Sequence, residues 1–352
     1  ADGHVQLGSI LVALGRLSEA GPVYETALGI APDGAEASFG RAFLRLLQGE
    51  YALGWQDYEF RPARRGPVPP ALQPQWRGED LAGKTLLIYA EQGFGDSIQF
   101  LRYAPALAAR GARVLVALPV PLMGLAARVE GVAEVVEPTF RLPPFDLCIP
   151  LGSLPLCFAT RLDDIPGAGG YLSAPPEQVA RWKGRLGGGD KFTVAFAWAG
   201  NPGHPNDHNR SVPLAELSPL LRVRGVRWLS LQKGPVAADL GRYREIDLLD
   251  LGEELGDFSD TAAVLSCADL TISVDTALCH LGGALGRPTW TLTPFAPDWR
   301  WSTERRDTPW YAAMRLYRQR SLGDWSGAMA EAAGDLATMA AGARFRAAGA
   351  AA

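Results

Sequence analysis

The chain is poor in the residues that build disulfide frameworks and metal sites. Its 352 residues include four cysteines and four histidines, and no two cysteines form a CxxC pair. This composition argues against a secreted scaffold held by disulfides, and a zinc centre is not expected. Because the cysteines sit mostly in apolar runs, we expect buried free thiols in a reducing compartment.

Long hydrophobic runs and strong charge of either sign are also missing. No apolar span of 18 residues occurs, and the N-terminus has no basic segment followed by an apolar one. The formal net charge is -4, without a cluster of Lys and Arg. We therefore expect no nucleic-acid partner and no membrane insertion. With 47% apolar and 20% charged residues, the composition is that of a folded, cytoplasmic protein of two or three domains.

The first 65 residues contain an internal repeat. Gly15 returns as Gly49 and Tyr24 as Tyr58, an offset of 34 positions in both cases. A 34-residue period of paired helices, with small residues where helices cross, resembles the tetratricopeptide repeat. The alternative is a helical hairpin whose similarity to its neighbour is a coincidence.

From residue 84 the pattern changes to short β-rich segments that alternate with helical ones. This alternation is typical of an α/β fold with parallel sheets, and a Pro- and Gly-rich stretch divides it into two Rossmann-like halves. Ligands are expected at the carboxyl ends of the strands, in a cleft between the halves. The predicted strands lie at 85–90, 114–118 and 146–150, and then at 192–198, 226–232, 246–251, 269–274 and 289–293.

These patterns predict the order of domains along the chain. Helical repeats occupy 1–65, a linker 66–83 and the first Rossmann-like domain 84–165. An interdomain linker at 166–190 precedes the second Rossmann-like domain at 191–325. A C-terminal helix with an alanine-rich tail covers 326–352.

A strand that leads directly into a helix marks a candidate anion site. Between them stands the sequence Asp-Thr-Ala-Leu-Cys-His at 275–280. The start of a helix leaves backbone N–H groups free and carries partial positive charge, so it attracts a phosphate. Thr276 can cap this helix, and His280 lies one turn further on the same face. The alternative is an ordinary helix cap followed by a core histidine.

The first Rossmann-like half opens with a strand, a glycine turn and a helix at 88–100. Gly93 and Gly95 permit a tight turn and the close approach of a ligand. Asp96, at the helix start, would stay ionised and face the cleft, where it can accept a proton from a hydroxyl as a general base. Asp96 as a plain helix cap is the alternative, and Glu91 is a rival base or a substrate contact.

Further polar residues follow the predicted strands of the second half. Arg210 and Ser211 can hold a phosphate, and Lys233 is a second candidate for that role. Asp257 can bind a ribose, although capping a helix is its more ordinary role. Trp299 can stack on a base or pack against the domain wall. The expected donor-binding set is completed by Asn201, Gln232, Asp275 and Ala277.

Three of these motifs resemble glycosyltransferase family 9, whose best-known members are the lipopolysaccharide heptosyltransferases. They are the Glu-Gln-Gly-Phe-Gly-Asp run at 91–96, Asp275-Thr276 with His280, and the Pro-Asp-Trp-Arg-Trp run at 297–301. The resemblance covers most of 84–319. It implies a GT-B fold and inverting transfer from a nucleotide sugar, without a metal or another cofactor.

The resemblance also assigns roles to residues. It implies that Asp96 is the base, that Asp275, Thr276 and His280 form the donor-phosphate turn, and that Lys233 contacts phosphate. The family commonly has a glycine where this chain has Ala277.

Such a domain joined to tetratricopeptide-like repeats is similar to bacterial protein glycosyltransferases, including those that modify flagellin before export. We therefore predict a cytoplasmic transferase whose repeats capture a protein acceptor. One alternative is a scaffold of helical repeats with an inactive GT-B domain. Another is a transferase that acts on a glycan or on lipopolysaccharide.

Overall fold

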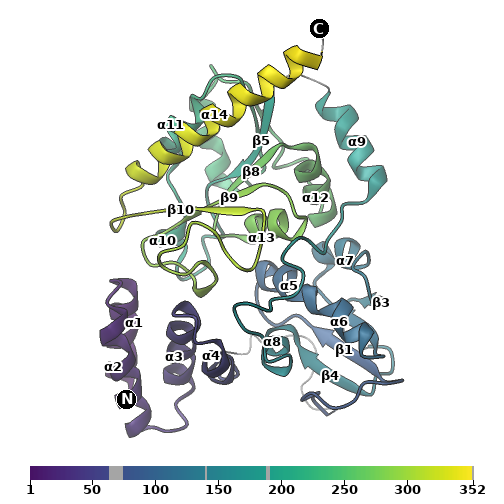
Figure 1. The fold of residues 1–352 in the computed structure, drawn as a ribbon, viewed down its shortest axis with the longest axis vertical. Helices are drawn as coiled ribbons and strands as arrows, with labels where there is room; N and C mark the ends of the chain where they lie inside the picture. Colours follow the sequence, from purple (N-terminus) through teal and green to yellow (C-terminus); the bar gives the residue numbers. More distant parts are fainter. Residues whose placement is uncertain (63–73, 139–140, 188–190, 351–352) are drawn as a thin grey trace. The chain divides into compact units, whose positions relative to one another are not determined.

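The computed structural model describes residues 1–62, 74–138, 141–187 and 191–350. The chain divides into two compact units (Figure 1). Unit 1 contains Ala1–Tyr171 and Ala296–Trp310, and unit 2 contains Leu172–Phe295 and Tyr311–Ala352. Parts of five predicted segments lie outside the described residues: 63–65 of the repeats, 66–73 of the first linker, 139–140 of the first Rossmann-like domain, 188–190 of the second linker and 351–352 of the tail.

Unit 1 begins with two helical hairpins, which Figure 1 draws in purple. Gly15 and Gly49 turn the chain within each hairpin in the left-handed region, with φ of 70° and 83°. A Cβ on Gly8 would lie 2.7 Å from the ring of Tyr24, and one on Gly40 would lie 2.5 Å from it. Tyr24 therefore fits between two helices that both lack a side chain at the crossing. The helices are α1 (Asp2–Ala13), α2 (Leu17–Ile30), α3 (Ala35–Leu47) and α4 (Tyr51–Tyr58).

The sheet of unit 1 is fully parallel, in the order β3-β2-β1-β4. Its strands are β1 (Thr85–Tyr89), β2 (Arg113–Ala117), β3 (Val132–Val136) and β4 (Leu147–Pro150). Between β1 and β2 the chain forms α5 (Phe94–Phe100), the 3-10 turn η1 (Leu101–Tyr103) and α6 (Ala104–Ala109). The remaining helical elements are α7 (Val120–Ala126), η2 (Leu151–Ser153) and α8 (Leu154–Cys157).

Unit 2 holds a second parallel sheet, in the order β10-β9-β8-β5-β6-β7. Both predicted Rossmann-like sheets are thus confirmed as parallel. The strands are β5 (Phe192–Ala197), β6 (Val226–Ser230), β7 (Leu248–Asp250), β8 (Leu270–Val274), β9 (Thr289–Thr293) and β10 (Met314–Arg318). The helical elements are α9 (Pro176–Leu186), α10 (Asp207–Arg210), η3 (Leu214–Leu217), α11 (Ser218–Leu221), η4 (Pro235–Arg242), α12 (Phe258–Cys267), α13 (Ala277–Ala284) and α14 (Ser326–Ala350).

The long helix α14 covers one side of the unit 2 core. It packs against α11, β5 and β10, and Figure 1 shows it as the yellow helix. Met329 and Leu336 of α14 are fully buried in a cluster that also contains Phe196 and Trp228. Among the residues that the structure describes, no helix combines the length and apolar character needed to cross a bilayer.

Two features differ from the expected order of domains. The stretch expected as an interdomain linker contains α9, which packs on α12 through the buried side chain of Trp182. In addition, Ala296–Trp310 leaves the second half and belongs to unit 1. The second Rossmann-like half is therefore interrupted by a segment that folds with the helical hairpins.

Aromatic rings attach this inserted segment to unit 1. The ring of Trp299, in the 3-10 turn η5 (Trp299–Trp301), lies 5.3 Å from that of Trp55 and 5.5 Å from that of Trp310. Trp310 donates through Nε1 to the hydroxyl of Tyr51 over 3.0 Å, and its carbonyl accepts from Arg102 over 3.0 Å. The hairpins, the sheet region and the segment therefore share one buried core.

Candidate active site

In unit 1, Asp96 stands in the first turn of α5, after the glycine turn that follows β1. Its Oδ2 accepts from the backbone N–H of Gly93 over 2.9 Å, so Asp96 caps its own helix, as one of the two sequence interpretations expects. Gly93 is the extended N-cap residue, and Gly95 lies inside the first turn. The side chain of Asp96 keeps 27% of its surface exposed. Capping therefore leaves the carboxylate accessible to another molecule.

The other carboxylate oxygen of Asp96 is paired with Arg300 from the inserted segment. Arg300 Nη2 donates to Asp96 Oδ1 over 2.5 Å. The same guanidinium donates through Nη1 to Asp298 Oδ1 over 3.0 Å and through Nε to Gln99 Oε1. Arg300 belongs to the 297–301 motif, but no local pattern indicates its role, because its partner Asp96 lies far away in the chain.

Glu91, the rival base, is tied to the end of the helical region. Its Oε1 accepts from Arg61 Nε over 2.8 Å and from Arg61 Nη2 over 2.6 Å. Arg61 also donates to Glu59 Oε1 over 2.9 Å. Burial raises the pKa of Glu91, while the charge of Arg61 acts in the opposite direction. Glu91 is thus a buried partner of an arginine, and Asp96 is the more exposed of the two carboxylates.

In unit 2, the predicted anion turn joins β8 to α13. Thr276 is the N-cap residue, and its hydroxyl accepts from Leu278 N over 3.4 Å. Because α13 begins at Ala277, directly after its cap Thr276, His280 lies in its first turn. His280 Nδ1 is 2.9 Å from the hydroxyl of Tyr311, and its Nε2 is 3.9 Å from Asp275 Oδ1. Tyr311 and Asp275 therefore orient the imidazole, and the sequence offers no local signal for Tyr311.

Arg210 reaches the same turn from α10. Its Nη1 donates to the carbonyl of Asp275 over 3.2 Å, and its Nε donates to Asp207 over 3.1 Å. The structure thus brings Arg210 to the turn that contains Thr276 and His280. Ser211 instead accepts from Gly200 N over 2.9 Å, and the helical turn after Pro213 has no side-chain cap.

The other predicted donor-binding residues have partners within their own units. Lys233 Nζ donates to the carbonyl of Leu255 over 2.7 Å, and Asp257 caps α12 through Ser259 N and Asp260 N. Gln232 Oε1 accepts from Trp198 N and Ala199 N, while Asn201 Oδ1 accepts from Gly203 N. Trp299 lies in the aromatic core of unit 1, in line with the packing alternative.

Asp275, Cys279 and His280 place their potential ligand atoms within 4.8 Å of one another, a group that the described residues offer for a metal ion. A thiolate is the form of cysteine that binds metals. Cys279 is buried, which raises the pKa of its thiol, and its Sγ donates to the carbonyl of Thr276 over 3.0 Å. This thiol is therefore held in its protonated form, and the absence of a metal cofactor stays a prediction.

A family comparison bears on the anion turn. Residues 256–303 match the model of glycosyltransferase family 9 (heptosyltransferase). This stretch is therefore similar to family 9 glycosyltransferases. The matched residues include α12, β8, α13 and β9, and also Arg300 of the inserted segment.

A curated relative is similar over most of the chain. Protein FlbA of Caulobacter vibrioides is 29% identical over 339 residues, which are 87% of this chain and 55% of the relative. The chain thus spans about half the length of the relative it matches.

Two solved structures resemble the chain in fold. A glycosyl transferase family 9 protein from Veillonella parvula matches with a TM-score of 0.52 and 13% identity, over 69% of this chain and 88% of its own. The ADP-heptose lps heptosyltransferase II of E. coli matches with a TM-score of 0.51 and 14% identity, over 72% of this chain and 99% of its own. The mixed α/β fold with parallel sheets is therefore of the kind found in heptosyltransferases.

Proposed function

We propose that this chain is a glycosyltransferase of the GT-B type, which moves a sugar from a nucleotide donor to an acceptor hydroxyl with inversion and without a metal. One observation carries the proposal. The start of α13 and His280, both inside the stretch that matches family 9, come together with Arg210 in unit 2. A cytoplasmic location is part of this proposal.

Positive charge at this turn suits the leaving group of sugar transfer. Breaking the bond between the anomeric carbon and the diphosphate leaves negative charge on phosphate oxygens, which a helix start and an arginine stabilise. Lys233 would add a further positive charge by exchanging its carbonyl partner for phosphate. Since the fold resembles that of the E. coli ADP-heptose lps heptosyltransferase II, ADP-linked heptose is the first donor to test.

Asp96 is the proposed base. It takes the proton of the acceptor hydroxyl while that oxygen bonds to the anomeric carbon, and the electrons of the broken bond leave with the diphosphate. Both carboxylates are paired with a buried arginine, but Asp96 keeps 27% of its side chain exposed against 10% for Glu91, which supports Asp96 as the base.

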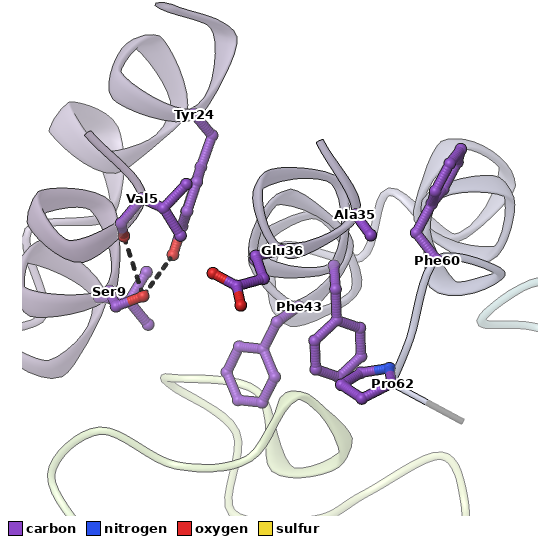
Figure 2. Close-up of a pocket in the computed structure, with 11 residues that line it drawn as sticks. Val5, Ser9, Tyr24, Ala35, Glu36, Phe43, Phe60 and Pro62 are labelled. Carbon is purple, nitrogen blue, oxygen red and sulfur yellow. Dashed lines mark hydrogen bonds between the residues drawn. The ribbon is translucent and has the colours of Figure 1, made fainter. Parts of the chain in front are cut away.

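A groove in the helical region supports a protein acceptor. A cavity of about 520 Å³ opens between the hairpins, with residues of α1 and α3 along its walls (Figure 2). Figure 2 shows the carboxylate of Glu36 on the side of Ser9 and Tyr24, and the ring of Phe43 beside it. We propose that these tetratricopeptide-like hairpins bind an extended segment of a flagellin-like protein. The apolar part of the wall is formed by Val5, Val12, Ala35, Phe39, Phe43, Phe60 and Pro62.

Calorimetric titration with nucleotides and nucleotide sugars tests the donor site. We expect one nucleotide class to bind saturably, and His280→Ala and Lys233→Ala to weaken its binding by about 10- to 100-fold, the value of a charge-assisted contact. His208→Ala, at an exposed position of α10 in the same unit, is the matched control. Absence of binding by the folded protein would instead favour a scaffold with an inactive GT-B domain.

A transfer assay tests the reaction. Asp96→Asn should bind the donor normally but lower kcat by about 100-fold or more, since general bases contribute on that scale. Flagellin-like protein and lipid-linked core sugars serve as alternative acceptors, because transfer to the second would identify a glycan-directed enzyme.

A further inference from the structure

Arg300 is a buried cation whose guanidinium is held at every nitrogen. Nη2 donates to Asp96 Oδ1 over 2.5 Å, Nη1 donates to Asp298 Oδ1 over 3.0 Å, and Nε donates to Gln99 Oε1. The side chain exposes 7% of its surface. Because a guanidinium is planar and its donors point in fixed directions, these three partners determine its orientation.

The position of Arg300 is fixed independently of Asp96. Its Cζ lies 4.1 Å from the ring centroid of Trp299, a cation–π contact. Trp299 is itself enclosed by aromatic residues, including Trp55 at 5.3 Å and Trp310 at 5.5 Å. Arg300 is therefore the fixed member of the ion pair. Asp96, with 27% of its side chain exposed, is the member that Arg300 can orient.

The charges of the group fit a proton acceptor. Two carboxylates, Asp96 and Asp298, share one guanidinium. When Asp96 takes a proton, Arg300 keeps the negative charge of Asp298 as its partner. A buried cation without such a partner would be costly, so Asp298 lowers the free energy of the protonated state.

We propose that Arg300 is a positioning residue for the base Asp96, and that Asp298 is the charge partner that permits Asp96 to accept a proton. This inference rests on the proposed transferase function. Gly93 N–H holds one carboxylate oxygen and Arg300 holds the other, and each oxygen keeps a further lone pair for the acceptor hydroxyl. Asp96 contacts the reacting hydroxyl, and Arg300 acts through Asp96.

Steady-state kinetics of Arg300→Gln and Arg300→Lys, beside Asp96→Asn, test this role. We expect Arg300→Gln to lower kcat by about 100-fold, the scale of a misplaced catalytic group, with the donor Kd unchanged. Arg300→Lys keeps the charge but loses the forked geometry, so it should restore only part of kcat. Arg305→Gln is the matched control, because Arg305 lies in the same segment and pairs with the exposed Asp307.

The pH dependence of kcat separates positioning from loss of structure. Because Arg300→Gln removes a positive charge beside the base, the acidic limb of the profile should move to higher pH in this variant. Removing the negative charge in Asp298→Asn should move the same limb to lower pH. A merely structural role would lower activity without these opposite shifts.

Each result has a distinct meaning. If Asp96→Asn abolishes transfer while both Arg300 variants keep the wild-type kcat and pH profile, the positioning role is wrong and the proposed function stands. Full activity in Asp96→Asn would overturn the proposed base itself. Should Arg300→Gln fail to fold, Arg300→Lys and Asp298→Asn still decide the question, because both keep a polar group in place.

Discussion

The hydroxyl of Tyr58 is a polar group enclosed by the core of unit 1. It donates to Gln92 Oε1 over 2.9 Å, beside the glycine turn that carries Asp96. Burial raises the pKa of Tyr58 to about 12 from an ordinary value near 10, and the charge of Asp96 acts in the same direction. The protonated phenol is therefore part of the folded state.

This shift predicts how stability depends on alkaline pH. In the unfolded chain Tyr58 ionises near pH 10, whereas in the folded chain it keeps its proton to about pH 12. The unfolded state binds fewer protons in that window, so the free energy of unfolding falls as pH rises. Tyr58→Phe removes this contribution. Between pH 10 and 12 the free energy of unfolding of this variant should therefore fall by roughly 2 kcal/mol less than that of the wild type. Urea unfolding across that window measures the difference. An equal loss of unfolding free energy in the wild type and the variant would show that the phenol of Tyr58 is not buried.

At the same scale, the sequence indicated reactive residues but not their partners. The starts of helices carry Asp96, Thr276 and His280. Capping and anion binding at such positions can be predicted from the local sequence. Arg300 and Tyr311 come from distant segments, and nothing local signals that they reach those helices. Partner choice is therefore a property of tertiary packing.

Among the elements, α1 and α3 approach Tyr24 through bare glycine positions. A Cβ at Gly40 would lie 2.5 Å from the Tyr24 ring, closer than real contacts allow. Gly40→Ala should therefore destabilise the hairpins by about 1–3 kcal/mol, the usual cost of overpacking. Chemical denaturation followed by circular dichroism measures this loss.

Gly29 of α2 provides the matched control. A Cβ there meets nothing within 4 Å, so Gly29→Ala should be neutral or stabilising by up to about 1 kcal/mol. Equal stability of the two variants would show that Tyr24 moves aside easily, and that the repeated glycines have another reason.

The predicted strands with apolar runs were confirmed, and β3 and β10, two of the four edge strands, were missed. In β10, Arg315 and Arg318 interrupt the apolar pattern. Arg315 is paired with Glu331 and Asp335 of α14, so its charge is satisfied by an element that follows later in the chain. Periodicity does not predict a strand where charged side chains, paired with another element, interrupt the pattern of apolar residues.

For the whole molecule, the inserted segment makes the helical hairpins part of unit 1. Helix α4 contributes Trp55 to the rings around Trp299, and Tyr58 to the loop before Asp96. The repeat period predicted a separate module at 1–65. A repeat is recognised from its own sequence, which does not indicate that a distant segment packs on its last helix. The aromatic run at 297–301 was recognised in the sequence, but the sequence did not predict that this run packs in unit 1.

Two deletions distinguish an integrated hairpin region from a detachable one. Removing residues 1–62 would expose Trp299 and Trp310, both buried, so we expect aggregation or loss of cooperative unfolding.

Removing residues 1–31 leaves α3 and α4 in place but takes away the α1 wall of the groove. This shorter deletion should keep donor binding and lose transfer to the protein acceptor. Light scattering, calorimetric donor titration and the transfer assay measure the three properties. A folded chain lacking 1–62, with unchanged donor affinity, would show that α4 is not needed to support the inserted segment.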